Sequence, residues 1–216
     1  SEDTLSWVQR GDTLIPANPE SGEEFGSALD LNADATVMVV GAREKGGKGG
    51  VYIFDWNSDA AEWLQRGDVL YAMDGQAGDF YGEAVALNDN GSVLAVGSRL
   101  RTNVISNDGG VYICDLNKDT DARIIRGDVL LNPVNEELAS FGVAVSFDSA
   151  GDVLAVGSFR QDLTFENQGV IYIFDRDGDS WSQRGDVLFA SDAESGGQFG
   201  NGIDLDSDAT SLITCT

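Results

Sequence analysis

Phe80-Tyr81-Gly82-Glu83-Ala84-Val85-Ala86-Leu87 is the first of four apolar runs that decide the fold. The other three are Ser92-Val93-Leu94-Ala95-Val96-Gly97-Ser98, Gly109-Gly110-Val111-Tyr112-Ile113-Cys114-Asp115 and Ile124-Ile125-Arg126-Gly127-Asp128-Val129-Leu130. Each run has the length of a strand and is rich in β-branched or aromatic residues, and clusters of Gly, Asn and Asp separate the runs. The stretch 80–130 therefore predicts four antiparallel strands that follow one another as a meander.

This four-strand unit repeats along the chain. The glycines of its Arg-Gly-Asp triplet are Gly11, Gly67, Gly127 and Gly185, which gives steps of 56, 60 and 58 residues. The glycines that follow Phe or Tyr in the first run keep the same three steps, at Gly26, Gly82, Gly142 and Gly200. One small sheet cannot bury both of its faces alone, so a four-stranded unit with this period is typical of propeller blades. The sequence predicts an all-β β-propeller of four-stranded antiparallel blades.

The landmarks also predict where each blade begins and ends. Residues 1–14 match the last strand of a blade, and residues 199–216 match the first two strands of a further one. Complete blades are predicted for 25–70, 80–130 and 140–188. Natural proteins protect unpaired strand edges, and the last blade lacks a third strand. We therefore expect the chain to be part of a propeller with six or seven blades.

Composition excludes several classes of function. The 216 residues have a formal net charge of -24, which would repel the phosphates of nucleic acid and suits calcium, a salty medium or a basic partner. No apolar run approaches the roughly 20 residues of a membrane span. The chain has no His, the commonest general base and metal ligand, and its 37 acidic residues fall in repeated turns. We therefore expect no enzymatic activity.

The repeated motifs carry a family resemblance. They are Phe-Gly-x-Ala-Val-x-Leu, Leu-Ala-Val-Gly-Ser, Gly-Gly-Val-Tyr-Ile-Phe and Trp-x-Gln-Arg-Gly-Asp-x-Leu. Together they resemble the FG-GAP repeat family, whose best known members are the integrin α-subunit propellers, and the match covers essentially the whole chain. The resemblance implies a β-propeller that is secreted or on the cell surface and binds proteins or glycans, and it implies nothing catalytic for the propeller itself. Some members of the family carry the propeller beside a hydrolase domain.

Two sets of hairpins carry Asp and Asn at alternate positions, a spacing that suits calcium. The more regular set lies between the third and fourth strands: Asp55, Asn57, Asp59, Asp115, Asn117, Asp119, Asp175, Asp177 and Asp179. The set between the first and second strands is Asp30, Asn32, Asp34, Asp204, Asp206 and Asp208, and Ala35 and Ala209 replace the glycine of the integrin-type loop there. Asp and Asn also dominate ordinary turns. Calcium is thus a candidate cofactor, and simple turns are the alternative.

The Arg-Gly-Asp triplets and the two cysteines have structural interpretations. Each triplet leads directly into an apolar run, which favours a scaffold role in which its Arg and Asp pair with neighbouring blades. Cys114 occupies a position that phenylalanine holds in the sister blades, and Cys215 occupies one that glycine holds. A buried free thiol explains Cys114, but the redox state of both cysteines stays open.

Basic residues predict a ligand surface. Of the 13 Lys and Arg residues, six belong to the loops between second and third strands: Arg43, Lys45, Lys48, Arg99, Arg101 and Arg160. These loops vary most and share one end of the propeller, as binding loops on a rigid scaffold do. We expect them to receive a protein or an acidic glycan. The alternative is that they neutralise acidic residues at the same end, such as Glu23, Glu24 and Asp79.

These observations favour a non-enzymatic binding or adhesion module that is secreted, extracellular or lumenal, alone or in a membrane-associated assembly. One alternative is a structural subunit of a larger extracellular or lumenal assembly, in which other subunits complete the open blade. The other is the accessory propeller of a hydrolase whose catalytic domain lies outside this chain.

Overall fold

The computed structural model describes residues 6–102, 107–117, 123–125, 128–134 and 136–215, with the backbone alone for 123–125. The first sheet contains β1 (Phe25–Leu31), β2 (Val37–Ala42), β3 (Gly50–Asn57) and β4 (Glu62–Gln65). The second contains β5 (Ala84–Leu87), β6 (Val93–Ser98), β7 (Gly110–Leu116) and β8 (Arg123–Ile125), and β9 (Leu130–Leu131) pairs with β7. The third contains β10 (Phe141–Phe147), β11 (Val153–Ser158), β12 (Val170–Asp177) and β13 (Ser180–Gln183). The fourth contains β14 (Gly202–Leu205) and β15 (Leu212–Cys215).

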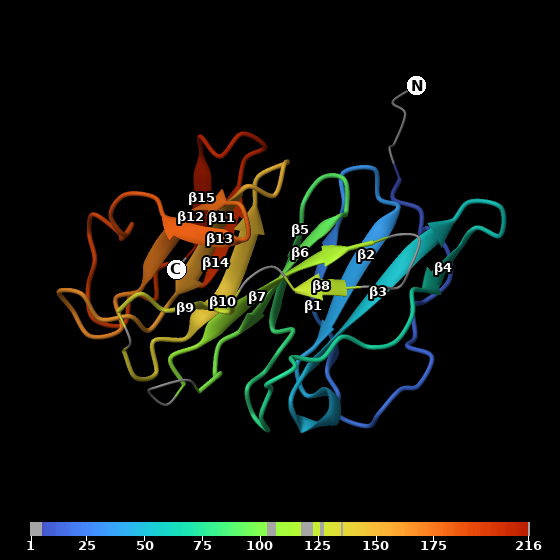
Figure 1. Cartoon of the computed structure of the whole chain (residues 1–216), viewed down its shortest axis with the longest axis horizontal. Coiled ribbons are helices and arrows are strands. Elements are labelled where there is room, and N and C mark those ends of the chain that lie inside the picture. The colour runs from blue at the N-terminus through green and yellow to red at the C-terminus, as the bar shows by residue number, and fades with distance from the viewer. Residues whose placement is uncertain (1–5, 103–106, 118–122, 126–127, 135, 216) are drawn as a thin grey trace.

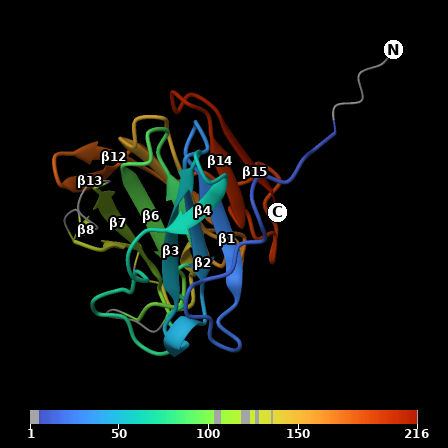
Figure 2. The same cartoon turned by 90° about the vertical axis from the view of Figure 1, so that its right-hand side faces the viewer.

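The four sheets stand side by side around an axis (Figures 1 and 2), and we call them blades one to four. All strand pairs in them are antiparallel, which confirms the all-β prediction. One turn of 3-10 helix, η1 (Lys45–Gly47), is the helical element among the described residues, and none of these residues forms a helix that could cross a membrane. The first strand of each blade lies next to the axis and the last lies outside.

Alternating side chains give each blade two apolar faces. In β6 the side chains of Leu94 and Val96 pack in a core shared with blade one, which includes Val39. The side chain of Ala95 points the opposite way, as the period of two along a strand requires, and packs in a core shared with blade three, which includes Leu154. Burial on both faces explains why the second strands are continuous Val, Leu and Ala runs.

Glycines set the distance between neighbouring blades. A Cβ atom added to Gly97 would lie 2.0 Å from the carbonyl oxygen of Gly142 in the next blade, and one added to Gly109 would lie 2.1 Å from that of Phe141. The same two contacts recur at the other junctions, between Gly41 and Gly82, Gly157 and Gly200, Gly49 and Tyr81, and Gly169 and Phe199. Any side chain at these positions would force the blades apart, which explains why the repeat keeps glycine there.

Backbone hydrogen bonds join the turns that follow the first strands. The amide of Ala33 donates to the carbonyl of Asp89 at 3.0 Å, that of Asp89 to Ser149 at 3.1 Å, and that of Ser149 to Ser207 at 3.0 Å. Each turn is closed by an Asn or Asp side chain that accepts two backbone amides, at Asn32, Asn88, Asp148 and Asp206. These turns therefore fix blade to blade as well as strand to strand.

Residues 6–14 differ from the prediction that residues 1–14 form a last strand. No strand forms between residues 6 and 14, and Trp7 is fully exposed. The guanidinium of Arg10 lies 4.2 Å from the ring centroid of Trp56 and donates to the carbonyl of Ala35 at 2.8 Å. A last strand needs a third strand to pair with, and blade four has only β14 and β15 among the described residues. The segment lies instead against blade one.

The close contact at Gly97 gives a stability prediction. Gly97→Ala should lower the free energy of unfolding by about 3 kcal/mol, because the new methyl group meets backbone that can move only if two blades separate. The matched control is Gly197→Ala, whose Cβ would lie 3.2 Å from the nearest atom and whose register position is held by Ala139 in the preceding repeat. The control should change stability by less than about 0.5 kcal/mol in urea unfolding. Equal losses for the two variants would contradict this account of the blade spacing.

Candidate functional site

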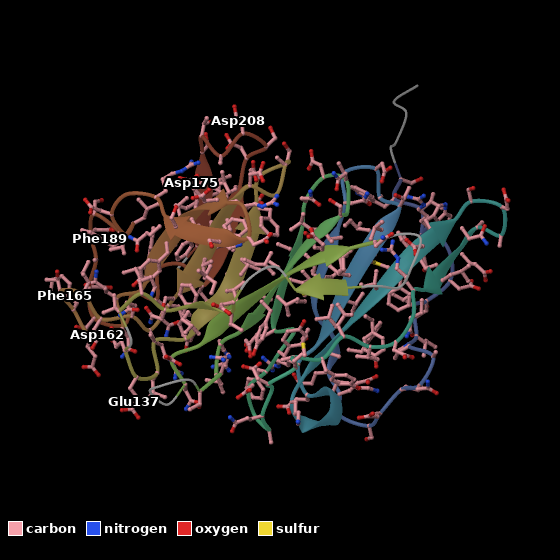
Figure 3. All side chains as sticks on the ribbon, in the orientation of Figure 1. Glu137, Asp162, Phe165, Asp175, Phe189 and Asp208 are labelled. Carbon is pink, nitrogen blue, oxygen red and sulfur yellow. The ribbon has the colours of Figure 1, made fainter. Side chains whose placement is uncertain are left out.

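The variable loops of the three complete blades meet at one end of the molecule. We call this end, formed by the loops after the second and fourth strands, the loop end, and the opposite end, formed by hairpin turns, the turn end. In Figure 3, Glu137 lies at the loop end and Asp208 at the turn end. Backbone hydrogen bonds tie the loops together, for example from Gly78 to the carbonyl of Gly47 at 2.8 Å and from Gly196 to that of Glu166 at 2.8 Å. The loop end is therefore an ordered surface.

In blade one the loop end contains a buried cation. The ammonium of Lys45 lies 2.8 Å from Glu23 and 3.0 Å from Glu20, and the Tyr52 hydroxyl donates to Glu23 at 2.9 Å. The side chains of Lys45 and Glu23 are almost completely buried. Burial alone lowers the pKa of Lys45, but its interactions with Glu23, Tyr52 and Glu20 outweigh burial and hold the pKa above its ordinary value. The Lys45 ammonium is charged, and it is paired with carboxylates of its own loop end.

Blade two repeats this arrangement with an arginine. Arg101 lies 2.7 Å from the carboxylate of Asp74 and donates to the Tyr112 hydroxyl at 2.9 Å, and Tyr112 donates to Asp74 at 2.7 Å. Burial raises the pKa of the Asp74 carboxyl, but hydrogen bonds from Arg101 and Tyr112 outweigh it and hold the pKa low. Burial, with the hydrogen bond to Asp74, raises the pKa of Tyr112.

Blade three has no cation at this position. Gln161 takes the place of Lys45 and Arg101, four residues after the glycine of the second strand. Its carbonyl oxygen accepts a hydrogen bond from Asn132 at 2.9 Å and its amide donates to Glu136. Burial raises the pKa of Glu136, and burial together with Glu136 raises the pKa of Tyr172 to about 12. A hydrogen-bond network without a cation thus replaces the ion pair.

The loop end of blade three exposes acidic and apolar side chains together. We define the blade-three patch by three acidic residues, Glu137, Asp162 and Glu166, and three apolar ones, Leu163, Phe165 and Phe189. The three apolar residues are 53%, 44% and 50% exposed. Among the described residues no basic side chain lies within ion-pair distance of these carboxylates. Figure 3 shows Asp162, Phe165 and Phe189 along the same outer edge.

Four of the six predicted ligand-binding residues are held in ion pairs at the loop end. Lys45 and Arg101 form the pairs described above, and Arg43 and Arg99 share the carboxylate of Glu83, at 3.2 and 2.6 Å. Arg43 also contacts Glu24. The positive charge of these four residues is therefore matched by carboxylates, as in the alternative that the sequence left open. For Lys48 and Arg160 no carboxylate of the described residues lies within ion-pair distance, and the role of all six in ligand binding stays a prediction.

The third-to-fourth-strand hairpins, at the turn end, use their first aspartate to hold an arginine of the Arg-Gly-Asp triplets. Asp55 accepts two hydrogen bonds from Arg66. Asp175 accepts three from Arg184, and these bonds lower the pKa of Asp175. The prediction that triplet arginines pair with neighbouring blades is wrong for these two, because the nearest carboxylate belongs to the same blade. The triplet acts as a scaffold there.

The other candidate calcium ligands lie in or beside the same turns. Asn57 accepts the backbone amides of Asp59 and Ala60, and Asp177 and Asp179 flank the turn after β12. Asp115 and Asn117 lie at the end of β7, and Asp119 lies outside the described residues. In the other set, Asp34 and Asp208 accept hydrogen bonds from the threonine two residues later. No group of three acidic, His or Cys side chains among the described residues converges as a metal site, and calcium stays a prediction.

A cavity of about 390 Å³ lies on the axis, lined by the first strands of all four blades. Asp30 reaches across from blade one and accepts the amide of Leu87 at 2.6 Å. Burial raises the pKa of Asp30, backbone amides oppose the shift, and the negative charge of Asp204 adds to it. Ser146 lies between, and its hydroxyl donates to Asp204 at 3.4 Å. Asp30 and Ser146 join blades, since the carboxylate of Asp30 and the hydroxyl of Ser146 each accept a backbone amide of the next blade.

The comparisons with known proteins identify a repeat and a fold. Residues 64–114 match the model of the FG-GAP repeat, which confirms the resemblance over that stretch. No curated protein sequence matches the chain. A candidate 6-phosphogluconolactonase from Bacteroides fragilis aligns with a TM-score of 0.55 at 15% identity, over 87% of this chain and 41% of that one. Sqt1 from Saccharomyces cerevisiae aligns with a TM-score of 0.50 at 11% identity, over 79% of this chain and 37% of that one.

Identities this low show the fold alone, and the β-propeller prediction is confirmed. The chain spans about two fifths of the length of these solved structures.

The buried cation of blade one yields a second prediction. Lys45→Met keeps the volume of the side chain but leaves Glu23 buried without its cation, so it should cost about 3 to 5 kcal/mol of unfolding free energy. Lys48→Met, an exposed neighbour, should stay within about 0.5 kcal/mol of the parent in the same urea titration. Adding Glu23→Gln to Lys45→Met should restore part of the loss. A Lys45→Met protein as stable as the parent would mean that the pair does not hold this loop.

The axial carboxylates predict a pH effect. The pKa of Asp30 is raised in the folded protein, so the folded state keeps a proton that the unfolded state has released. Its contribution to stability should therefore fall as pH rises from about 3.8, the ordinary Asp value, through the raised pKa. Asp204→Asn should lower the pKa of Asp30 and so narrow the pH range over which this contribution to stability is lost. Carboxyl-carbon NMR titration measures this directly, and an unchanged Asp30 titration in the variant would exclude coupling across the axis.

Proposed function

We propose that this chain is a non-enzymatic binding module whose blade-three patch docks a protein partner with a basic, apolar surface. The FG-GAP repeat and the propeller fold support a binding or structural module, and the patch supplies the surface. The observation that carries the proposal is that Glu137, Asp162 and Glu166 have no basic side chain within ion-pair distance among the described residues. Their charge is therefore available to a partner, whereas carboxylates beside Lys45 and Arg101 in blades one and two are paired.

The apolar residues of the patch provide anchors for such a partner. Phe165 and Phe189 come from two different loops, and these loops are joined by the hydrogen bond between Gly196 and Glu166. Aromatic side chains that lose water at the centre of an interface carry much of its binding free energy, and the surrounding charges select the partner and speed its approach. The net charge of -24 would steer a basic partner toward this surface from a distance.

An anionic glycan fits this surface less well than a basic protein. Arg43, Lys45, Arg99 and Arg101 already have carboxylate partners, and a glycan would have to displace them. We propose an extracellular or lumenal location, because FG-GAP repeats are typical of extracellular proteins. Catalysis is not part of the proposal, since the likeness to the Bacteroides fragilis protein concerns the fold.

The test is a peptide-display selection against the immobilised chain, followed by affinity measurements on the enriched peptides. We expect peptides rich in Lys or Arg with aromatic or aliphatic residues between them. The double variant Phe165→Ser and Phe189→Ser should weaken their binding by roughly 30-fold or more, since each anchor contributes at least about 1 kcal/mol. Asp162→Lys with Glu166→Lys should mainly slow association and reduce its salt dependence.

Ile213→Ser is the matched control, because Ile213 is 75% exposed and lies on β15, outside the patch. It should leave the affinity unchanged. Enrichment of acidic peptides, or equal loss of binding in the control, would exclude the blade-three patch as the docking surface.

A further inference from the structure

We propose that Asn90 is an acceptor for an asparagine-linked glycan. The chain contains twelve asparagines, and Asn90 is the one followed by the acceptor pattern, a residue other than proline and then Ser or Thr, here Gly91 and Ser92. The inference rests on the extracellular or lumenal location proposed above, because the modification occurs in the secretory pathway. It is independent of which surface binds a partner.

The fold places Asn90 where such a group can be attached. Asn90 is exposed at the tip of the hairpin between β5 and β6, at the turn end. Its side-chain oxygen accepts the backbone amide of Ser92 at 2.9 Å, which orients the amide toward the hydroxyl-bearing residue of the pattern. Its side-chain nitrogen makes no hydrogen bond to any residue that the structure describes. Substitution at that nitrogen would therefore break no hydrogen bond among the described residues.

Two other asparagines, one in the same turn and one at the loop end, do not share this freedom. The side-chain nitrogen of Asn88 donates to the carbonyl of Ala150 in blade three at 3.0 Å, and that of Asn132 donates to Gln161 at 2.9 Å. Asn88 and Asn132 are also buried. A glycan on either would disrupt the packing between loops or blades, whereas one on Asn90 would stand in solvent.

The repeat shows that the scaffold tolerates change at this position. Eight residues after the first-strand glycine, the other turns have Asp34, Ala150 and Asp208 where this one has Asn90. Three different side chains at one register mean that no blade contact depends on it. Two sister turns, Asp34-Ala35-Thr36 and Asp208-Ala209-Thr210, differ from the acceptor pattern by Asp in place of Asn. Blade two is thus the blade whose turn has the acceptor pattern, although the turn itself is the same as in the other blades.

The covalent step needs a lipid-linked oligosaccharyl diphosphate as the donor. The side-chain nitrogen of Asn90 forms a bond to the anomeric carbon of the sugar, the bond from that carbon to the diphosphate breaks, and one amide proton is released. The glycan is bulky and solubilising. Because Asp89 lines the axial cavity, the glycan would stand beside the turn-end mouth of that cavity and on the opposite end from the blade-three patch. It would leave the loop end open to a partner.

The test expresses the chain behind a secretion signal in insect cells and measures the intact mass of the secreted and intracellular protein before and after N-glycosidase treatment. We expect one enzyme-sensitive glycan. Peptide mapping after cleavage in heavy-oxygen water should place the label at position 90. Asn90→Gln and Ser92→Ala should both abolish the mass shift, and Ser92→Thr should keep or raise its occupancy.

The matched control is Asn201→Gln, since Asn201 is also exposed and also precedes a glycine but lacks the Ser or Thr of the pattern. It should leave the glycan in place. Thermal melting of Asn90→Gln should match the unglycosylated parent, as the register comparison requires. Unmodified protein in both the parent and Ser92→Thr would overturn the proposal, and so would a glycan elsewhere or deamidation at Asn90 as the only change.

The outcome is separable from that of the proposed function. Peptide binding at the blade-three patch should be the same, within about twofold, for glycosylated protein, enzyme-treated protein and Asn90→Gln. If no glycan is found while patch binding persists, the acceptor proposal fails and the docking proposal stands. If the glycan is found and no peptide binds, the acceptor proposal stands and the docking proposal fails.

Discussion

The contact between a glycine of one blade and a backbone carbonyl of the next is the constraint on which this structure depends. At Gly97 and Gly142 the backbones of two blades approach so closely that there is no space for a Cβ atom on Gly97. The spacing brings the apolar faces into one core and the turns at Asp89 and Ser149 into hydrogen-bonding range. It also lines up the loops, so that equivalent positions of successive blades lie at the same end. Interiors are close-packed, so a change at one junction is transmitted to all of these features.

At the loop end, the few Lys and Arg side chains of this acidic chain pair with its own carboxylates. At the loop end Lys45 is buried and Arg101 is partly buried, and each pairs with a carboxylate that also binds a tyrosine of the third strand. A buried ion pair needs both partners, because either charge alone would be costly to bury. In blade three the position holds Gln161, which satisfies its neighbours by hydrogen bonds without charge. At that loop end Glu137, Asp162 and Glu166 are exposed and pair with no cation of the described residues, so blade three presents an acidic surface where blades one and two hold ion pairs.

Most of the fold could be predicted from the repeated motifs of the sequence. Strands were predictable because apolar runs and glycines recur at steps of 56, 60 and 58 residues, and the structure places β-strands on all the complete copies. The ion pairs were not predictable, because a loop sequence does not show whether Lys45 points inward. A comparison of Lys45, Arg101 and Gln161 by register would have given the signal. Residues 6–14 match the repeat yet form no strand, since pairing depends on a neighbour distant in sequence.

In a repeat fold, structural residues can be told from functional ones by comparing the blades. Interactions that recur in every blade are those that hold the blades together. The glycine contacts, the turns closed by Asn or Asp and the pairs of Asp55 with Arg66 and Asp175 with Arg184 recur, which marks them as support. The axial Asp30 also supports the fold, since its carboxylate joins two blades through a backbone amide, although blade two has Ala86 at this register. Functions specific to this chain have to come from positions where the copies differ. The loop end of blade three and the turn tip at Asn90 are such positions, on opposite ends of one rigid body, so each can change without disturbing the contacts between blades.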